Sequence, residues 1–302
     1  MKQKSIWQII LSLILSALIL CSCDPYLILF GSSSSEEETE KTNDGNLTVH
    51  YLDVGQGDSI FIELPNGEDM LIDAGENYYG EGIINYIKGE GYDKIDYLIA
   101  THPHSDHIGS MAYIVRNFSI GRVYMPKVSN NTTQYESLLK AIKNKELTVK
   151  NGKAGVNVVI GEDFSADIIA PKTIDKENLN NCSIVLKIVY GETSFLFTGD
   201  AETGEMNKID KNDLASDVLK AGHHGSRTST TKKLLKKIKP EFTVISCGKN
   251  NDYGHPHEEV LKALEKIGSR VYRTDKHKTV IIISDGKEYT VKTGNKSIAR
   301  AK

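Results

Sequence analysis

The stretch Ala100-Thr101-His102-Pro103-His104-Ser105-Asp106-His107-Ile108-Gly109 carries three histidines and one aspartate within six positions. It directly follows an apolar segment, residues 95–100, whose composition predicts a buried strand that ends in a tight loop. Imidazole and carboxylate groups are the usual protein ligands of zinc, manganese and iron. An exposed histidine-rich loop would have the same composition, but the position of this run immediately after an apolar strand favours a metal site.

Five other loops with polar residues also follow apolar stretches. They are residues 53–58, Asp73, Gly199-Asp200, Gly222-His223-His224-Gly225-Ser226 and Gly254-His255-Pro256-His257. Ligands of layered αβ folds gather at the ends of strands, so we expect these loops to surround the histidine-rich run. A second cation would need a bridging carboxylate, for which Asp200 is the natural candidate, and a terminal imidazole from His223 or His224. Two cations about 3.5–4 Å apart can activate a water molecule and hold both oxygens of an in-line displacement.

The order of the predicted elements gives two halves, each with a β-hairpin first and alternating strands and helices after it. The first half has strands over 47–54, 59–64, 69–73 and 94–100 and helices over 82–88 and 108–117, and a more variable middle follows. The second half has strands over 183–190, 193–198, 217–221 and 242–247, helices over 201–209 and 256–267, a helix capped by Ser229 or Thr230 that ends at Ile238, and three closing strands. We therefore expect two packed αβ halves with the site at their seam.

The first residues have the pattern of a secretory signal, with a basic start at Met1-Lys2-Gln3-Lys4 and an apolar run over 6–20. The run ends in Leu20-Cys21-Ser22-Cys23, which resembles a bacterial lipobox with Cys23 as the lipidated first residue of the mature protein. An uncleaved membrane anchor is the alternative, although residues 6–20 are short for a spanning helix. Either interpretation predicts an extracytoplasmic protein that is anchored to the cell membrane, and we favour the lipoprotein.

Three segments follow from this pattern: a signal peptide with lipobox over 1–23, a flexible linker over 24–46, and a hydrolase domain over 47–294. The linker is rich in serine and glutamate and lacks apolar periodicity, so it cannot bury enough surface to fold. The formal net charge is -3, so any nucleic-acid partner would have to be met by a local patch. Cys182 and Cys247 stand in apolar contexts without the spacing of a metal site, and we expect buried thiols.

The run His102-Pro103-His104-Ser105-Asp106-His107 resembles the signature of the metallo-β-lactamase superfamily, and the chain is closer still to the metallohydrolase domain of ComEC-type DNA-uptake competence proteins. Asp73 in Ile72-Asp73-Ala74-Gly75 matches the first superfamily motif, and Asp200 in Thr198-Gly199-Asp200 matches its bridging aspartate. The closer likeness is carried by residues 53–59, 222–226, 244–251 and 253–256, and it covers nearly all of residues 47–292. The choline-phosphate esterase of pneumococcal teichoic acid is similar in the same loops.

The resemblance implies a four-layer αβ/βα sandwich, a site for two divalent metal ions, zinc or manganese, and hydrolysis of phosphodiester or phosphoester bonds. The sequence departs from the wider superfamily in one respect, because no histidine occurs between His107 and His223, where another ligand of the first metal usually stands. The corresponding region reads Asn180-Asn181-Cys182-Ser183. The first metal would then be more open, or would lean on Asp58, Asn181 or the second histidine of the His223/His224 pair.

The same resemblance assigns metal ligands. His102 and His104 would bind one metal, Asp106 and His107 the other, and Asp200 would bridge the two. His223 is the favoured terminal ligand and His224 the alternative.

Further roles are assigned to residues around these ligands. Asp106 would also orient the nucleophile, and Asp73 would either fix a ligand histidine or cap the end of a hairpin. His255 would protonate the leaving oxygen, contact phosphate, or cap the helix after Pro256. Ser226 and Arg227 stand where hydroxyl, guanidinium and backbone N–H groups could meet phosphate.

Five lysines cluster after this loop: Lys232, Lys233, Lys236, Lys237 and Lys239. They would form either a basic surface for a nucleic-acid backbone or the solvated face of a helix whose apolar side is Leu234, Leu235 and Ile238, and we favour the solvated face.

The favoured function is a membrane-tethered, metal-dependent hydrolase that cleaves phosphoester bonds in the manner of a nuclease, with DNA as a candidate partner. One alternative is a hydrolase of phosphoester substituents on a teichoic-acid-type cell-wall polymer. Another is a metal-stabilised binding module without catalysis. The missing middle histidine argues against a β-lactamase.

Overall fold

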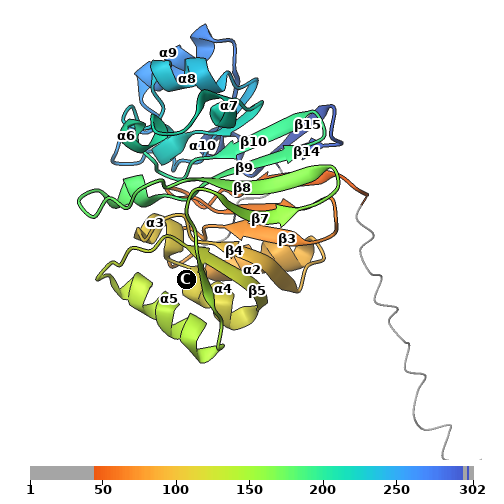
Figure 1. Ribbon diagram of the computed structural model, residues 1–302, viewed down its shortest axis with the longest axis vertical. Coiled ribbons are helices and arrows are strands. Elements are labelled where there is room, and N and C mark those ends of the chain that lie inside the picture. Colours follow the sequence, from red (N-terminus) through yellow and green to blue (C-terminus); the bar gives the residue numbers. More distant parts are fainter. Residues whose placement is uncertain (1–43, 295–297, 299–302) are drawn as a thin grey trace, which may run out of the picture. The chain divides into compact units, whose positions relative to one another are not determined.

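Two β-sheets pack face to face, and helices cover the outer face of each sheet (Figure 1). This computed structural model describes residues 44–294 and 298, all within one unit, Thr42–Lys302. The expected signal peptide over 1–23, the lipidation site Cys23 and most of the expected linker lie outside the described residues. The first strand begins at Leu47, where the domain was expected to begin.

The first sheet has the strand order β15-β14-β1-β2-β3-β4-β5-β6 in the described part of the chain. Its strands are β1 (Leu47–Tyr51), β2 (Ile60–Glu63), β3 (Asp69–Ile72), β4 (Lys94–Ile99), β5 (Ser119–Met125), β6 (Val149–Asn151), β14 (Val280–Ser284) and β15 (Tyr289–Thr293). β1, β2 and β3 are antiparallel, whereas β3 to β6 run parallel. The loops that follow β3 and β4 therefore leave the sheet at the same edge.

The second sheet has the strand order β13-β12-β11-β10-β9-β8-β7. Its strands are β7 (Val156–Ile160), β8 (Phe164–Ala170), β9 (Val185–Tyr190), β10 (Thr193–Phe197), β11 (Val218–Lys220), β12 (Phe242–Ile245) and β13 (Arg270–Arg273). β7 to β10 are antiparallel, and β10 to β13 run parallel. The loops after β10, β11 and β12 thus also share one edge.

The helices complete the layers, and they are α2 (Gly80–Gly89), α3 (Ser105–Ile108), α4 (Met111–Asn117), α5 (Thr133–Asn144), α6 (Thr203–Met206), α7 (Lys211–Leu214), α8 (Lys232–Ile238), α9 (Glu258–Lys266) and α10 (Thr274–His277), with 3-10 turns η2 (Leu179–Cys182) and η3 (Gly222–Gly225). Alternation along the strands explains how they pack. In β2, Ile60 and Ile62 face the other sheet, whereas Phe61 faces the helices. In β10, Phe195 faces inward and Leu196 packs toward α8 and α9. The expected four-layer αβ/βα sandwich is confirmed.

Several expected elements differ in the structure. The helix expected over 108–117 is two helices, α3 and α4, and Gly109 between them is so crowded that a Cβ would lie 2.5 Å from the backbone nitrogen of Asn77. The helix expected over 201–209 is α6 followed by the separate α7. The cap of α8 is Thr231, whose hydroxyl accepts from the N–H of Leu234, and not Ser229 or Thr230. β14 and β15 leave the second half and join the first sheet beside β1.

Cys182 and Cys247 are both free thiols in the interior, as expected. Within residues 44–294, no helix combines the length and the apolar character needed to cross a membrane.

Candidate metal centre

Strand ends from both sheets deliver the polar residues to one place. Asp73 follows β3, and residues 102–107 follow β4 and continue into α3. Asp200 follows β10, and His223 and His224 follow β11 within η3. The site therefore lies where the loops of the two halves meet.

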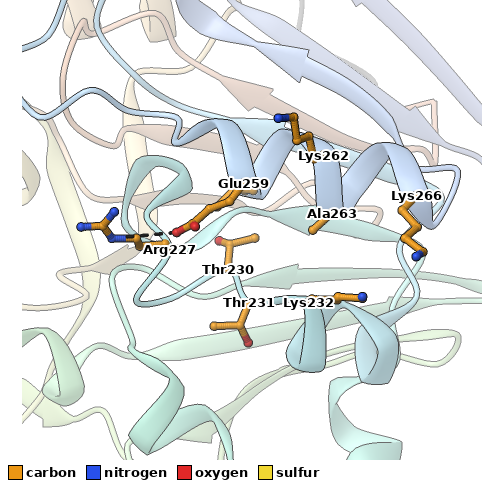
Figure 2. A pocket seen from close by; sticks show the side chains of 9 residues that line it. Arg227, Thr230, Thr231, Lys232, Glu259, Lys262, Ala263 and Lys266 are labelled. Atoms are coloured by element: carbon orange, nitrogen blue, oxygen red, sulfur yellow. Dashed lines mark ion pairs between the residues drawn. The ribbon is translucent and has the colours of Figure 1, made fainter.

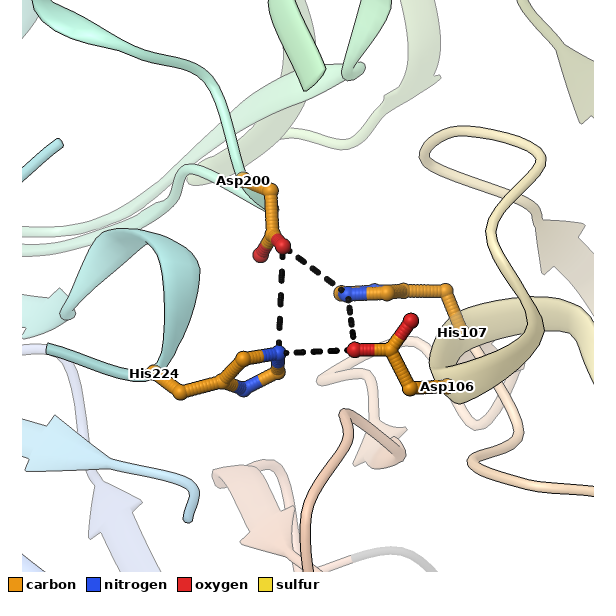
Figure 3. Close-up of side chains that lie close together, drawn as sticks. All are labelled: Asp106, His107, Asp200 and His224. Atoms are coloured by element: carbon orange, nitrogen blue, oxygen red, sulfur yellow. Dashed lines mark hydrogen bonds and ion pairs between the residues drawn. The ribbon is translucent and has the colours of Figure 1, made fainter. Parts of the chain in front are cut away.

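Four side chains converge there: Asp106, His107, Asp200 and His224 (Figure 3). One ligand atom from each lies within 4.8 Å of all the others. His107 Nε2 is 3.3 Å from Asp200 Oδ2 and 3.7 Å from Asp106 Oδ2. His224 Nε2 is 3.1 Å from Asp106 Oδ2 and 3.7 Å from Asp200 Oδ2. Two carboxylates and two imidazoles thus surround a common point, and His224 completes this cluster where the sequence analysis favoured His223.

The remaining histidines approach the same aspartate from outside this cluster. Asp200 Oδ2 lies 3.6 Å from His223 Nε2 and 3.9 Å from His102 Nε2. His102 Nε2 in turn lies 3.0 Å from His104 Nδ1. Asp200, a member of the four-residue cluster, is thus also approached by His223 and by His102, and His104 adjoins His102. His223 supplies an imidazole to this histidine group, which lacks the middle histidine of the wider superfamily.

Outer partners fix the ring of each buried histidine. His107 Nδ1 donates to Asp73 Oδ2 at 2.7 Å, and His224 Nδ1 donates to the carbonyl oxygen of Ser246 at 3.0 Å. His102 Nδ1 lies 3.1 Å from the Thr101 hydroxyl, which itself donates to Asp73. A proton held on Nδ1 leaves the lone pair of Nε2 directed at the site, which is the arrangement that metal-bound histidines use.

Asp58 and Lys220 form a buried ion pair behind His224. Lys220 Nζ lies 2.7 Å from Asp58 Oδ2, and both side chains are almost fully enclosed. Asp58 Oδ1 lies 3.4 Å from His224 Nδ1. Burial opposes the charge on Asp58, but Lys220 and His224 lower the pKa of its carboxyl to about 2. Asp58 therefore supports His224 from behind; it lies outside the four-residue cluster and instead groups with Asp73 and His107.

The field inside the cluster favours positive charge. Burial alone would lower the pKa of His224, but the carboxylates of Asp200, Asp106 and Asp58 raise it to about 10. Burial also acts to lower the pKa of His107, but the carboxylates of Asp200, Asp106 and Asp73 have the larger effect and raise this pKa well above its ordinary value. A metal cation at this place would be stabilised by the same carboxylates.

Unsatisfied buried atoms supply a second test of whether a cation fits. Among the described residues, His107 Nε2 and Asp200 Oδ1 are buried without a hydrogen-bond partner. Leaving such groups unpaired costs about 1–3 kcal/mol each unless another partner binds them. Carboxylate and imidazole donors around one point suit zinc, manganese or iron. The residues present therefore fit a divalent cation in the four-residue cluster.

The backbone of the site adopts conformations that its residues rarely take. His223 and His224 are consecutive left-handed residues, with φ of 52° and 54°, and Asp73 has φ of 57°. Such conformations cost of order 1–3 kcal/mol each and concentrate at functional sites. At Gly57, an added Cβ would lie 2.4 Å from the carbonyl oxygen of Asp106, so this position excludes a side chain.

A pocket of about 380 Å³ opens over the ligands, and polar neutral side chains form its outer wall. Besides the ligands it is lined by Gln56, Ser105, Asn130, Thr132, Gln134, Asn180, Tyr253 and His255. Four of these, Asn130, Thr132, Gln134 and Asn180, come from α5 and its preceding loop or from η2, segments without a recognisable motif. Sequence reasoning therefore missed them, as it missed Lys220, whose only signal was a lysine inside an apolar strand.

Asn181 was expected to support the first metal, and Ser226 and Arg227 to contact phosphate, but all three lie elsewhere or are engaged. The side-chain amide of Asn181 donates a hydrogen bond to Asp175 and accepts one from the backbone N–H of Glu202. Its neighbour Asn180 lines the pocket instead. The Ser226 hydroxyl lies 3.1 Å from that of Thr228 within its own turn. Arg227 is exposed and lines a separate groove.

His255 lies at the pocket, with its Nδ1 buried and, among described residues, without a hydrogen-bond partner. Burial and the neighbouring imidazoles of His224, His223 and His257 lower its pKa to about 4. It does not cap α9, because His257 holds that position.

Comparison with known proteins identifies relatives of this chain. ComE operon protein 3 of Bacillus subtilis is 32% identical over 281 residues, which cover 87% of this chain and 35% of that protein. Competence protein ComA of Neisseria gonorrhoeae is 30% identical over 253 residues, which cover 82% of this chain and 34% of that protein. The chain thus spans about a third of the length of these relatives.

The solved structure of Igni18, a metallo hydrolase from Ignicoccus hospitalis, shares the fold with a TM-score of 0.54 at 17% identity, covering 78% of this chain and 98% of that one. The model of the metallo-β-lactamase superfamily matches residues 52–249, which hold every residue of the four-membered cluster. The chain belongs to the metallo-β-lactamase superfamily and resembles the ComEC-type competence proteins within it.

Proposed function

We propose that the protein is a metal-dependent hydrolase that cleaves the phosphodiester bonds of DNA. The observation that carries this proposal is the pair of ligand groups that share Asp200 beneath an open, polar pocket. The competence-protein relatives support a DNA-related substrate. Zinc and manganese are the cations proposed, and both suit the carboxylate and imidazole donors.

When bound, two divalent cations would lower the pKa of a water molecule and stabilise charge that develops on the phosphoryl oxygens. Asp106, His107, Asp200 and His224 would hold one cation, and His102, His104 and His223 would hold the other with Asp200 between them. The rigid partners of these residues, Asp73 and the Asp58–Lys220 pair, keep the ligand atoms in place. Because the ligands come from both halves, the scissile bond would lie across the seam.

The pocket wall supplies the means to orient a phosphodiester. The amides of Asn130, Gln134 and Asn180 and the hydroxyl of Thr132 can donate hydrogen bonds to phosphate and sugar oxygens. The depressed pKa of His255 keeps this imidazole neutral at pH 7. A hydrogen bond from His255 to the substrate is therefore favoured over a role as a charged proton donor.

The experiment uses the purified protein with zinc or manganese added. Single-stranded DNA, double-stranded DNA and a small chromogenic phosphodiester are incubated with the wild type, Asp106→Asn and Asp93→Asn. We expect the wild type and Asp93→Asn to cleave, since Asp93 is exposed and outside the site, and Asp106→Asn to lose at least 100-fold in rate. Metal binding without turnover of any ester would instead identify a binding module.

A cell-envelope substrate is the second candidate, because the signal-like N-terminus of the sequence would carry the protein to the membrane surface. Hydrolysis of phosphorylated teichoic-acid substituents in the same assay, without cleavage of DNA, would favour it. We further propose an extracytoplasmic, membrane-anchored location. Labelling with radioactive palmitate, lost in Cys23→Ala, would test the lipid anchor.

A further inference from the structure

A basic groove of about 410 Å³ lies between α9 and the segment that leads into α8 (Figure 2). Arg227 and Lys232 stand on one wall, and Lys262 and Lys266 on the other. Glu259 is the acidic residue among those that line it. Four cationic side chains and one acidic side chain thus line the groove, on a chain whose formal net charge is -3, so the lining itself carries an excess of positive charge.

The groove is separate from the metal pocket, but one end of it lies next to that pocket, because both of its walls follow loops that carry pocket residues. Arg227 comes three residues after His224, and its backbone N–H donates to His257 Nδ1 at 3.2 Å. The backbone N–H of His257 donates to the carbonyl oxygen of Gly225 at 3.1 Å. The ring of His255 lies 4.8 Å from that of His257 and 5.5 Å from that of His223. The Arg227 end of the groove therefore adjoins the loops that carry His223 and His255 to the metal pocket.

The positive charges of the groove are available to a ligand. Arg227 and Glu259 are 3.8 Å apart, and Lys262 and Glu258 are 2.7 Å apart, but all four side chains are more than 60% exposed. Exposed pairs of this kind contribute little and exchange readily. Lys232 and Lys266 form no ion pair with any described residue, so their charges face solvent.

An aromatic side chain stands at the mouth of the pocket. Tyr253 is 67% exposed, and its ring lies nearly parallel to that of His255, at 19° and 5.7 Å between centroids. Exposed aromatic rings beside a basic groove are the means by which proteins hold single-stranded nucleic acid, since the bases stack on them. A polyol-phosphate polymer carries the same backbone charge but offers no base to stack.

We infer that single-stranded DNA binds along this groove through its phosphates, with a base stacked on Tyr253 where the strand enters the metal pocket. This inference rests on the proposed function and deepens it, because it specifies single-stranded DNA and the surface that binds it. The predicted apolar side of α8 is buried, since Leu234, Leu235 and Ile238 face the interior. Lys232, the first lysine of this helix, lines the groove and is assigned to DNA binding.

The test measures DNA binding without turnover, so it stands apart from the hydrolysis assay. A fluorescent single-stranded oligonucleotide is titrated in the Asp106→Asn background at several salt concentrations, with fluorescence anisotropy as the readout. Lys232→Glu/Lys266→Glu is compared with Lys287→Glu/Lys292→Glu, which makes the same charge change on the exposed β14–β15 hairpin. Thermal unfolding confirms that each variant folds.

We expect the groove variant to bind at least 10-fold more weakly than the hairpin variant. The slope of log affinity against log salt should fall by about 1.4, because two phosphate contacts are lost from a single strand. Tyr253→Ala should weaken binding about 5-fold or more without changing that slope, while Tyr253→Phe should retain affinity.

Equal affinity of the groove and hairpin variants would overturn the inference. So would teichoic acid that competes as strongly as DNA while Tyr253→Ala has no effect, since the occupant would then be an envelope polymer. Binding that behaves as expected in a protein that hydrolyses no ester would refute the proposed function and leave the groove as a DNA site.

Discussion

Asp73 lies outside the proposed ligand set, but it holds the ring of His107 in its orientation. Its carboxylate accepts from His107 Nδ1 at 2.7 Å, from the Thr101 N–H at 2.8 Å and from the Thr101 hydroxyl at 2.6 Å. We predict that Asp73→Ala lowers metal affinity roughly 10- to 100-fold, because the His107 ring loses its orientation. Competition against a chromogenic chelator measures this, with Asp93→Asn as the control. Unchanged affinity would mean that His107 is held without Asp73.

The Asp58–Lys220 pair makes a prediction about stability. Removing Lys220 in Lys220→Met would leave a buried carboxylate without its cation, which we expect to lower the free energy of unfolding by about 3–5 kcal/mol. The second change in Asp58→Asn/Lys220→Met removes that charge and should recover a large part of the loss. Urea denaturation of both variants gives the comparison. A double variant no more stable than Lys220→Met would show that the ion pair is not the cause.

At the scale of elements, the pairing of β3 with β4 contains two facing carboxylates. Asp69 accepts from the N–H of Asp96, and Asp96 accepts from the N–H of Asp69, both at 3.2 Å. Burial and the charge of Asp96 raise the pKa of Asp69 to about 8. The folded state therefore holds a proton that the unfolded chain releases near pH 4, so this pairing loses stability as the pH rises from about 4 to about 8.

We accordingly predict that Asp69→Asn is more stable than the wild type at pH 8, and that the advantage shrinks toward pH 5. A pKa shift of about one unit corresponds to about 1.4 kcal/mol, so even half of this shift gives about 2–3 kcal/mol at pH 8. Thermal unfolding across this pH range is the measurement. Asp93→Asn makes the same charge change at an exposed position and should show no such trend. A pH-independent difference would contradict the shifted pKa.

Some elements could be predicted from local pattern and others could not. β2, β3, β4 and β10 are apolar runs bounded by turns, so their positions were readable. β14 belongs to the first sheet because it pairs with β1, a strand more than 200 residues away in the sequence. The choice between His223 and His224 depends on two consecutive left-handed residues, a conformation for which adjacent histidines give no signal. Such features follow from tertiary packing.

At the scale of the molecule, the site joins the two halves. Asp106 and His107 come from the loop after β4 in the first sheet, and Asp200 and His224 from the loops after β10 and β11 in the second. The histidine-rich run could be proposed as a metal site from its sequence alone. Which loops of the second half lie next to this run could not be predicted, because the packing of the two sheets decides it and no local sequence pattern does. The seam also explains why Lys220, a residue of β11, pairs with Asp58 from the loop before β2.

A cation held by ligands from both halves must link metal content to the stability of the whole domain. A ligand present at 100 times its dissociation constant stabilises the folded state by about 2.7 kcal/mol, which for a domain of this size is about 5–10 °C in Tm. We therefore predict that EDTA lowers the Tm of the metal-loaded wild type by about that amount. Asp106→Asn and Asp200→Asn, one from each half, should both lose most of the EDTA effect, whereas Asp93→Asn should keep it. If only Asp106→Asn lost it, the cation would be held by the first half alone, and the seam would not be its binding site.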